Sequence, residues 1–177
     1  MDLKEILSKK HEFAREVAMH AHNDAGQYRI GTGERYHKHP EAVSDILEAY
    51  GADDIICSAA SLHDTLEDTE LTYENLINMF GKDVADLVNE VTNSPDLDGL
   101  NKEDYMSSKL LKLSDDALVI KLGDMIHNCL DNPRLKQMQR MKNNIEFLKR
   151  KRKQLNRLHK DLIETFFNSF YYKLKVK

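Results

Sequence analysis

The chain has 177 residues, with 26 Lys and Arg against 30 Asp and Glu, which predicts one globular domain over residues 1–177. The formal net charge of −4 excludes a globally basic nucleic-acid-binding protein but leaves room for a local basic patch. No apolar run approaches the ~20 residues of a membrane span, and MDLKEILSKK lacks the apolar stretch of a signal peptide. We therefore expect a cytoplasmic protein without membrane contact, in which Cys57 and Cys129 are reduced, buried thiols.

Helical periodicity dominates the first half of the chain. Residues 2–23 are predicted as an amphipathic helix, and the three glycines of AGQYRIGTGERY then predict a loop. His39-Pro40 begins a helix that runs to Tyr50, because proline suits the first turn. Asp53 or Asp54 is suited to cap the next helix, which carries IICSAASLHDTLED.

The second half continues in the same way. Thr72 begins the short helix YENLINMF, and another helix runs from Lys82 to about Val91. NSPDLDGLN is a linker by composition, followed by a helix near 102–112 and by one that Ser114 can cap, which carries DALVIKLGDMIHNCL. One long C-terminal helix is predicted over about 134–172. The whole pattern predicts an all-α bundle of about eight helices.

The C-terminal segment has a heptad-like apolar stripe. Its members are Met138, Met141, Ile145, Leu148, Leu155, Leu162 and Phe166. Packing of this helix on its own bundle is the favoured interpretation, and a homodimer seam is the alternative. The same segment carries KRKRK at 149–153, with Arg157 and Lys160 close by. A solvated helix surface is the favoured interpretation of these charges over a patch for an anion, a nucleic acid or a partner.

The segment SLHDTLEDT at 61–69 concentrates groups that do chemistry. On a continuous helix, Glu67 lies four residues after His63 and three after Asp64, and Asp68 lies four after Asp64. One face would then present an imidazole and three carboxylates. Three acids that close repel one another, and a bound cation is the simplest reason to tolerate them.

A second polar stripe follows the apolar run ALVIKL. Lys121, Asp124, Asn128 and Asp131 are spaced three, four and three apart, on a helix whose other positions are largely apolar. Such a stripe needs partners, and either a metal with a polar ligand or a solvated helix edge would supply them.

The remaining histidines carry weaker signals. His39 stands at a helix start, where a histidine is most often a surface or capping residue. We expect His20 and His22 to be structural or exposed, His127 to have a packing role, and His11 and His159 to be solvated.

Taken in order, these motifs resemble those of the HD-domain superfamily, and specifically the hydrolase domain of the RelA/SpoT alarmone enzymes. AGQYRIGTGERYHKHP resembles the loop AGQxRxxGxPYxxHP, HDTLEDT resembles HDxxEDT, and VIKLGDMIHN resembles VKLADRxHN. The resemblance covers roughly residues 10–135. The chain ends where that family's synthetase domain would begin, so we expect a stand-alone small alarmone hydrolase with an HD-domain helical bundle.

The resemblance implies the site residue by residue. The metal ligands would be His39, His63, Asp64 and Asp124, with manganese as the expected ion and zinc or iron also compatible with these residue types. Glu67 and Asp68 match the family's catalytic acidic pair, which orients and deprotonates water. The candidate substrate contacts are Arg29 for the guanine base, Asn128 for the sugar–phosphate part, Lys121 or Lys38 for developing charge, and Asp131.

The implied reaction is removal of the 3′-pyrophosphate from guanosine tetra- or pentaphosphate, (p)ppGpp, to give GDP or GTP and pyrophosphate. The substrate loop departs from the family pattern: it is one residue longer before Gly33, Ile30 replaces a basic or small polar residue, and Arg35 stands where proline is common. Gly123 and Met125 replace Ala and Arg of the third motif. The alternatives are therefore another nucleotide phosphohydrolase, such as an NADPH 2′-phosphatase or a nucleotidase, and a non-catalytic nucleotide-binding module.

Overall fold

The computed structural model describes the backbone of residues 3–94 and 101–176, and these residues form helices joined by short connections. The predicted all-α class is confirmed. Residues 1–92 and 93–177 are two compact units, here called unit 1 and unit 2. Residues 95–100, most of the predicted linker, lie outside the described part of the chain, and the prediction of one domain over 1–177 stays a prediction. Within the described residues, no helix has both the length and the apolar character to cross a bilayer.

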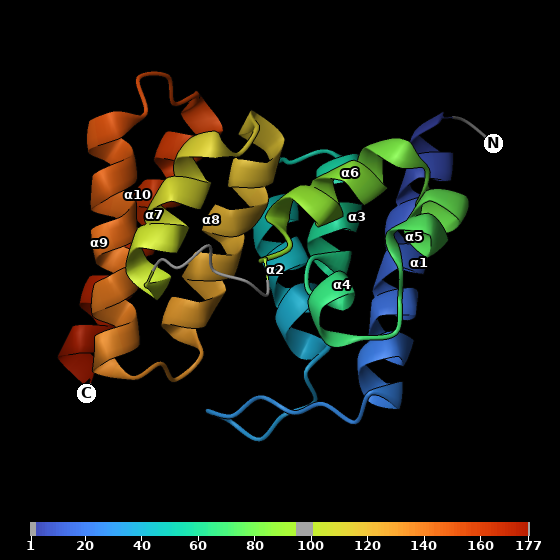
Figure 1. The fold of residues 1–177 in the computed structure, drawn as a ribbon, viewed down its shortest axis with the longest axis horizontal. Coiled ribbons are helices and arrows are strands. Elements are labelled where there is room, and N and C mark those ends of the chain that lie inside the picture. The colour runs from blue at the N-terminus through green and yellow to red at the C-terminus, as the bar shows by residue number, and fades with distance from the viewer. Residues whose placement is uncertain (1–2, 95–100, 177) are drawn as a thin grey trace. The chain divides into compact units, whose positions relative to one another are not determined.

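Unit 1 is built around a buried central helix. Its helices are α1 (Leu3–Asp24), α2 (Lys38–Ala49), α3 (Asp54–Leu62), α4 (Thr65–Asp68), α5 (Tyr73–Phe80) and α6 (Lys82–Val91). The Asp53 side chain caps α3 by accepting from the backbone N–H of Ile56. Every residue from Ile56 to Leu62 is buried, because α1, α2 and α6 all pack against α3 (Figure 1).

The predicted helix through IICSAASLHDTLED is wrong in one respect: α3 ends at Leu62, and His63 and Asp64 form a turn before α4. Two side chains bond to backbone carbonyls at this point. His63 Nδ1 lies 2.8 Å from the Ala60 oxygen, and the Thr65 hydroxyl donates to the Leu62 oxygen at 2.7 Å. Such local bonds compete with the next helical N–H groups for the same carbonyls, and here they end the helix.

The predicted glycine loop between α1 and α2 is a small hairpin. Tyr28 and Arg35 form an antiparallel bridge, and the Arg29 N–H donates to the Glu34 oxygen at 2.8 Å. Gly33 has a φ of 73°, a left-handed conformation that suits glycine, and its N–H closes the turn on the Arg29 oxygen. The hairpin extends away from the helices of unit 1 (Figure 1).

Unit 2 contains α7 (Lys102–Lys112), α8 (Asp115–Leu130), α9 (Leu135–Lys151) and α10 (Arg157–Val176). The Ser114 side chain caps α8, as predicted, by accepting from the N–H of Ala117. α8 packs on α10 and α7 packs on α9. The residues of α8 from Ala117 to Ile126 are all buried, so this helix is the centre of the unit.

The predicted single helix over 134–172 is wrong: it is two helices, α9 and α10, joined by a connection at 152–156. Arg152 takes an extended conformation, and its guanidinium donates to the carbonyls of Leu110 and Leu113 and pairs with Asp115 at 2.6 Å. The chain then begins α10 with Asn156, whose side chain accepts from the N–H of His159 at 2.9 Å. Arg152 therefore has a structural role within the basic cluster.

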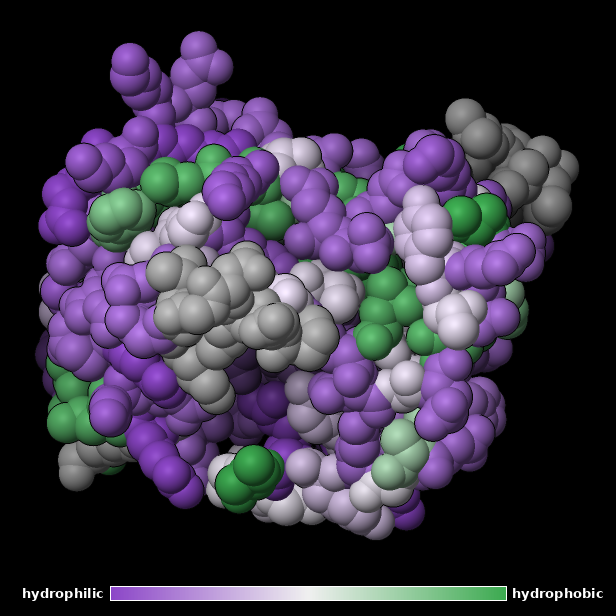
Figure 2. All heavy atoms as spheres, viewed as in Figure 1, coloured by the Kyte–Doolittle hydropathy of each residue, from purple (hydrophilic) through white to green (hydrophobic). Residues whose placement is uncertain are grey.

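The apolar stripe of this segment is used inside unit 2. Its buried members are Met138, Ile145, Leu148, Leu162 and Phe166. This confirms packing of the segment on its own bundle, and association of two copies stays a prediction. In the view of Figure 2 the surface is mostly hydrophilic, with apolar side chains in small separated patches.

Two histidines differ from expectation. His11 and His159 were predicted to be solvated, but both are buried, with exposed fractions of 6% and 0%. His11 Nε2 lies 2.7 Å from the hydroxyl of Ser44, and His159 Nε2 lies 2.8 Å from the carbonyl oxygen of Asp115. Each imidazole thus bonds a partner far away in the sequence, which periodicity alone does not reveal. Cys57 and Cys129 are buried thiols, as predicted.

Candidate metal centre

Three side chains of unit 1 bring two imidazoles and a carboxylate together. His39 Nε2 lies 3.6 Å from one carboxylate oxygen of Asp64, and His63 Nε2 lies 3.1 Å from the other. The two rings meet edge to face, with centroids 5.2 Å apart. Both histidines are 1% exposed, and the Asp64 side chain is 13% exposed. The group is therefore almost closed to bulk water.

Two neighbouring elements place these side chains. His63 and Asp64 follow one another at the end of α3, where both keep right-handed helical backbone angles, with φ of −60° and −100°. His39 reaches the same place from α2, whose buried first turn includes His39 and Pro40.

The backbone contact of His63 fixes which ring nitrogen faces the carboxylate. The Ala60 oxygen can only accept, so Nδ1 donates to it, and Nε2 lies beside Asp64. A histidine held in this way is prepared to ligate a metal through Nε2. Two imidazole nitrogens with a carboxylate suit a divalent cation of intermediate hardness, so the donor set of unit 1 fits a metal.

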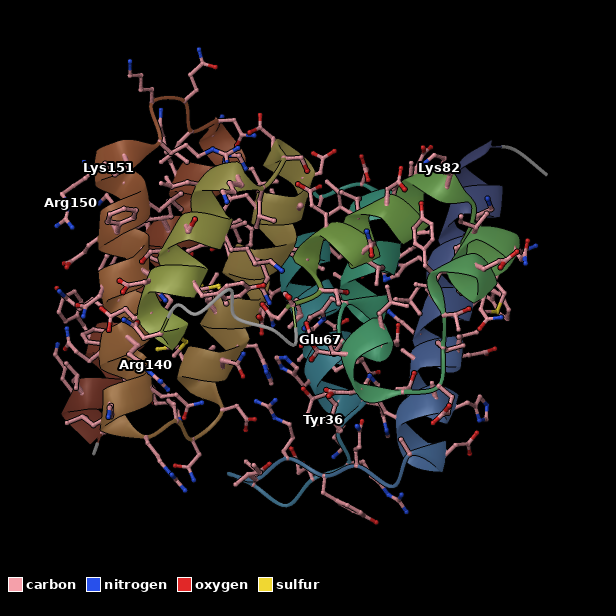
Figure 3. The ribbon with its side chains drawn as sticks, in the orientation of Figure 1. Tyr36, Glu67, Lys82, Arg140, Arg150 and Lys151 are labelled. Atoms are coloured by element: carbon pink, nitrogen blue, oxygen red, sulfur yellow. The ribbon has the colours of Figure 1, made fainter. Side chains whose placement is uncertain are left out.

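Tyr36 supports this group and was not singled out from the sequence. Its hydroxyl donates to Asp64 at 2.8 Å, and its ring lies against the rings of His22 and His39, with centroid distances of 4.9 and 5.9 Å. The available signal was its place in the quoted loop motif, three residues before His39. Figure 3 labels Tyr36 at the point where the hairpin leads into α2.

The two remaining acids of the motif, Glu67 and Asp68, lie on α4, and both residues are exposed. They line a cavity of about 610 Å³, which is within the usual size range of pockets for small ligands. Partial burial and the negative charge of Asp64 raise the pKa of the Asp68 carboxyl, and the nearby Tyr36 hydroxyl opposes this shift. Asp68 is thus electrostatically coupled to the group formed by His39, His63 and Asp64.

The hairpin carries cations above aromatic rings. The Arg29 guanidinium lies 5.4 Å from the centre of the Tyr36 ring, and that of Arg35 lies 5.0 Å from the Tyr28 ring. Ile30, at the turn, is 98% exposed. Lys38, one candidate for charge stabilisation, instead pairs with Glu34 at 2.9 Å on the surface, and this hydrogen bond raises the pKa of its ammonium.

In unit 2 the predicted polar stripe lies on α8. The Lys121 ammonium donates to one oxygen of Asp124 at 3.0 Å, and the Asn128 amide donates to the other. Lys121 is 3% and Asp124 9% exposed, so a solvated helix edge is wrong for this part of the stripe. Asp131 lies one residue beyond α8 and is half-buried. The stripe is therefore a hydrogen-bonded polar group within a buried helix.

Comparison with known proteins shows which family the sequence matches. The sequence profile of the HD domain matches residues 14–146. A GTP pyrophosphokinase rsh of Brucella ovis is 34% identical over 133 residues, which are 72% of this chain and 17% of that protein. The bifunctional (p)ppGpp synthase/hydrolase SpoT of Escherichia coli is 37% identical over 118 residues, 63% of this chain and 16% of that protein. The chain thus spans about one sixth of the length of these relatives.

Solved structures show the same likeness in three dimensions. One, described as a metazoan ortholog of SpoT that hydrolyzes ppGpp, superposes with a TM-score of 0.71 at 27% identity, covering 90% of this chain and 94% of that one. The Listeria monocytogenes protein lmo0812 has a TM-score of 0.55 at 22% identity and covers 75% of this chain and 94% of its own, which is a likeness of fold.

Proposed function

The chain belongs to the HD domain family, and from this premise we propose that it hydrolyses the 3′-pyrophosphate of ppGpp or pppGpp. The observation that carries this proposal is the buried group of His39, His63 and Asp64, which stands at the HD motif beside the acids of α4. Support comes from the 0.71 TM-score to a protein described as hydrolysing ppGpp.

His39, His63 and Asp64 would hold a divalent cation, and we propose Asp124 of the VIKLGDMIHN motif as a fourth ligand. Manganese is the proposed ion, and zinc and iron(II) are compatible with the same donors. When bound, such a cation supplies Lewis acidity at a phosphoryl oxygen and lowers the pKa of water. The contact of Lys121 with Asp124 offsets part of the carboxylate charge within α8.

Glu67 and Asp68 would orient the attacking water and accept its proton. The bond between the ribose 3′ oxygen and phosphorus breaks, the water oxygen joins phosphorus, and the ribose oxygen gains a proton. Because partial burial of the carboxyl and the negative charge of Asp64 raise the pKa of Asp68, this carboxylate is a stronger base than an aspartate with the usual pKa. The products are GDP or GTP and pyrophosphate.

The remaining substrate contacts are proposals from the motifs. Arg29 would lie against the guanine base or a phosphate, since its guanidinium is already held over the Tyr36 ring. Asn128 would contact the sugar–phosphate part. Lys121 is proposed to stabilise developing charge on the phosphoryl group, beside its bond to Asp124, and Asp131 is proposed as a further substrate contact.

A second candidate is hydrolysis of another nucleotide, which the altered hairpin favours. Ile30 is fully exposed at its turn, and Arg35 lies over Tyr28 where the family commonly has proline. The test is a panel of ppGpp, NADPH and nucleoside triphosphates, each with and without manganese. Selective cleavage of ppGpp supports the first candidate, and intact ppGpp beside another cleaved nucleotide contradicts it. Binding without cleavage of any nucleotide would indicate a non-catalytic module.

Two further expectations stay predictions: a cytoplasmic location and association into a homodimer. The partner of the site is proposed to be the guanosine nucleotide alone.

Nucleic-acid binding is not proposed, because Arg152 of the basic cluster is engaged within unit 2 and Lys149 lies 5.2 Å from the Phe167 ring. Figure 3 shows Arg150 and Lys151 extending outward from the end of α9.

A further inference from the structure

Gln27 connects three parts of unit 1 that the site needs. Its side-chain amide donates to the backbone oxygen of Asp68 at 2.6 Å, and its Oε1 lies 2.6 Å from His22 Nδ1. Its own backbone oxygen accepts from the N–H of Tyr36 at 3.1 Å. One residue therefore joins α1, the acidic helix α4 and the tyrosine that bonds Asp64.

The donor and acceptor of each hydrogen bond between His22, Gln27 and Asp68 follow from the chemistry of these groups. The Asp68 oxygen is a carbonyl and can only accept, so the amide nitrogen of Gln27 faces it and Oε1 faces His22. His22 must then donate from Nδ1. The order is His22 Nδ1–H to Gln27 Oε1, and Gln27 Nε2–H to the Asp68 carbonyl.

His22 is suited to hold the carboxamide in one orientation. Its side chain is fully buried, and its ring lies against Tyr36. Burial lowers the pKa of His22, which keeps the ring neutral with a single hydrogen on Nδ1. Its Nε2 has no hydrogen-bond partner among the described residues, so Nδ1 is the atom through which it acts.

Asp68 needs such support because α4 has a single turn. The helix runs only from Thr65 to Asp68, and so short a helix has little stability of its own. The Asp68 carbonyl stands at the end of this helix, where no further helical N–H reaches it. The side-chain amide of Gln27 donates to this carbonyl in place of a helical N–H.

We propose that Gln27 is a positioning residue for the acidic pair on α4, and that His22 fixes the orientation of its carboxamide. The proposal rests on the proposed hydrolase function for its kinetic effect, but its structural part does not. Loss of the bond lets α4 shift, and a displacement of about 1 Å in a reacting group can lower turnover on the order of 100-fold. We expect His39, His63 and Asp64 to keep their contacts with one another.

The first variants remove the bond at Gln27. Gln27→Met keeps the length of the side chain without its polar atoms. Gln139→Met is the matched control, because the Gln139 amide also donates a hydrogen bond, to Asn143 on the exposed face of α9. We expect kcat to fall roughly 10- to 100-fold in Gln27→Met, with KM and the calorimetric affinity for Mn²⁺ little changed. Gln139→Met should match the unmodified protein. Unchanged kcat in Gln27→Met would overturn the proposal.

The second pair of variants tests the orientation of His22. Asparagine can place its amide N–H near the position of Nδ1, whereas glutamine places its own near Nε2. We expect His22→Asn to keep most of the activity and His22→Gln to lose as much as Gln27→Met. Equal losses in both would overturn the role of His22, because a role in packing alone does not distinguish the two ring nitrogens.

Hydrogen exchange separates this inference from the proposed function. In Gln27→Met, the backbone amides of residues 65–69 should exchange faster than in the unmodified protein, whatever the substrate is. An unmodified protein that leaves ppGpp intact contradicts the proposed function alone. Unchanged exchange in Gln27→Met overturns the inference, even if ppGpp is cleaved.

Discussion

Replacement of Tyr36 by phenylalanine tests how the metal centre is supported. The change removes the hydroxyl that donates to Asp64 at 2.8 Å and keeps the ring that lies against His22 and His39. The Asp64 side chain is only 13% exposed, so little water can replace the lost donor. Loss of a bond that orients a metal ligand weakens binding about 10- to 100-fold. Because Asp64 keeps its contacts with both imidazoles, we expect the affinity for Mn²⁺ to fall about tenfold, which is ~1.4 kcal/mol of binding free energy.

The assay is calorimetric titration of metal-free protein with Mn²⁺. Tyr73→Phe is the matched control, because the Tyr73 hydroxyl also donates to a carboxylate, that of Asp86, on the exposed surface of unit 1. The control should bind the metal as the unmodified protein does. Equal affinities in Tyr36→Phe and the unmodified protein, or equal weakening in the two variants, would refute the reasoning. The Tyr36 hydroxyl also lowers the pKa of Asp68, so in Tyr36→Phe the acid limb of the rate profile should move to higher pH.

Three further predictions concern the acids, a buried histidine and a helix start. Glu67→Ala with Asp68→Ala should lower kcat by about 100-fold or more while Mn²⁺ still binds; unchanged turnover would contradict their roles. Burial lowers the pKa of His11, so the free energy of unfolding should fall as the pH drops below about 6.5, by at most ~1.4 kcal/mol per pH unit. In His11→Gln, denaturant titrations should show a weaker dependence of this free energy on pH. The same slope in both proteins would contradict this. Asn156→Ala should cost about 1 kcal/mol in calorimetric unfolding by removing the bond at the start of α10, and an unchanged transition would speak against it.

The motif residues could be found from the sequence because their chemistry is unusual where they stand. Acids beside an apolar helix and a lysine within ALVIKLGD need partners, whatever the fold. The structure supplies such partners within each unit: His39 and His63 beside Asp64, and Lys121 beside Asp124. Their family resemblance then gave the expected ion and reaction.

The errors lie where side chains bond to the backbone. A periodic pattern continues through His63 and Asp64, but bonds to the Ala60 and Leu62 carbonyls end α3 there. The break after α9 had a signal in the sequence, since Asn156 and His159 stand at the spacing of a helix cap. Gln27 and Tyr36 had none beyond their place in the loop motif, because neither is a ligand and each acts through another residue.

Product analysis of ppGpp hydrolysis tests the central claim most directly. Protein reconstituted with Mn²⁺ is incubated with ppGpp, and the products are followed by phosphorus NMR, with Asp64→Asn as the variant that lacks the carboxylate charge. The account predicts GDP and pyrophosphate in equal amounts, formed by the unmodified protein and not by the variant. Intact ppGpp, or release of orthophosphate in place of pyrophosphate, would contradict it.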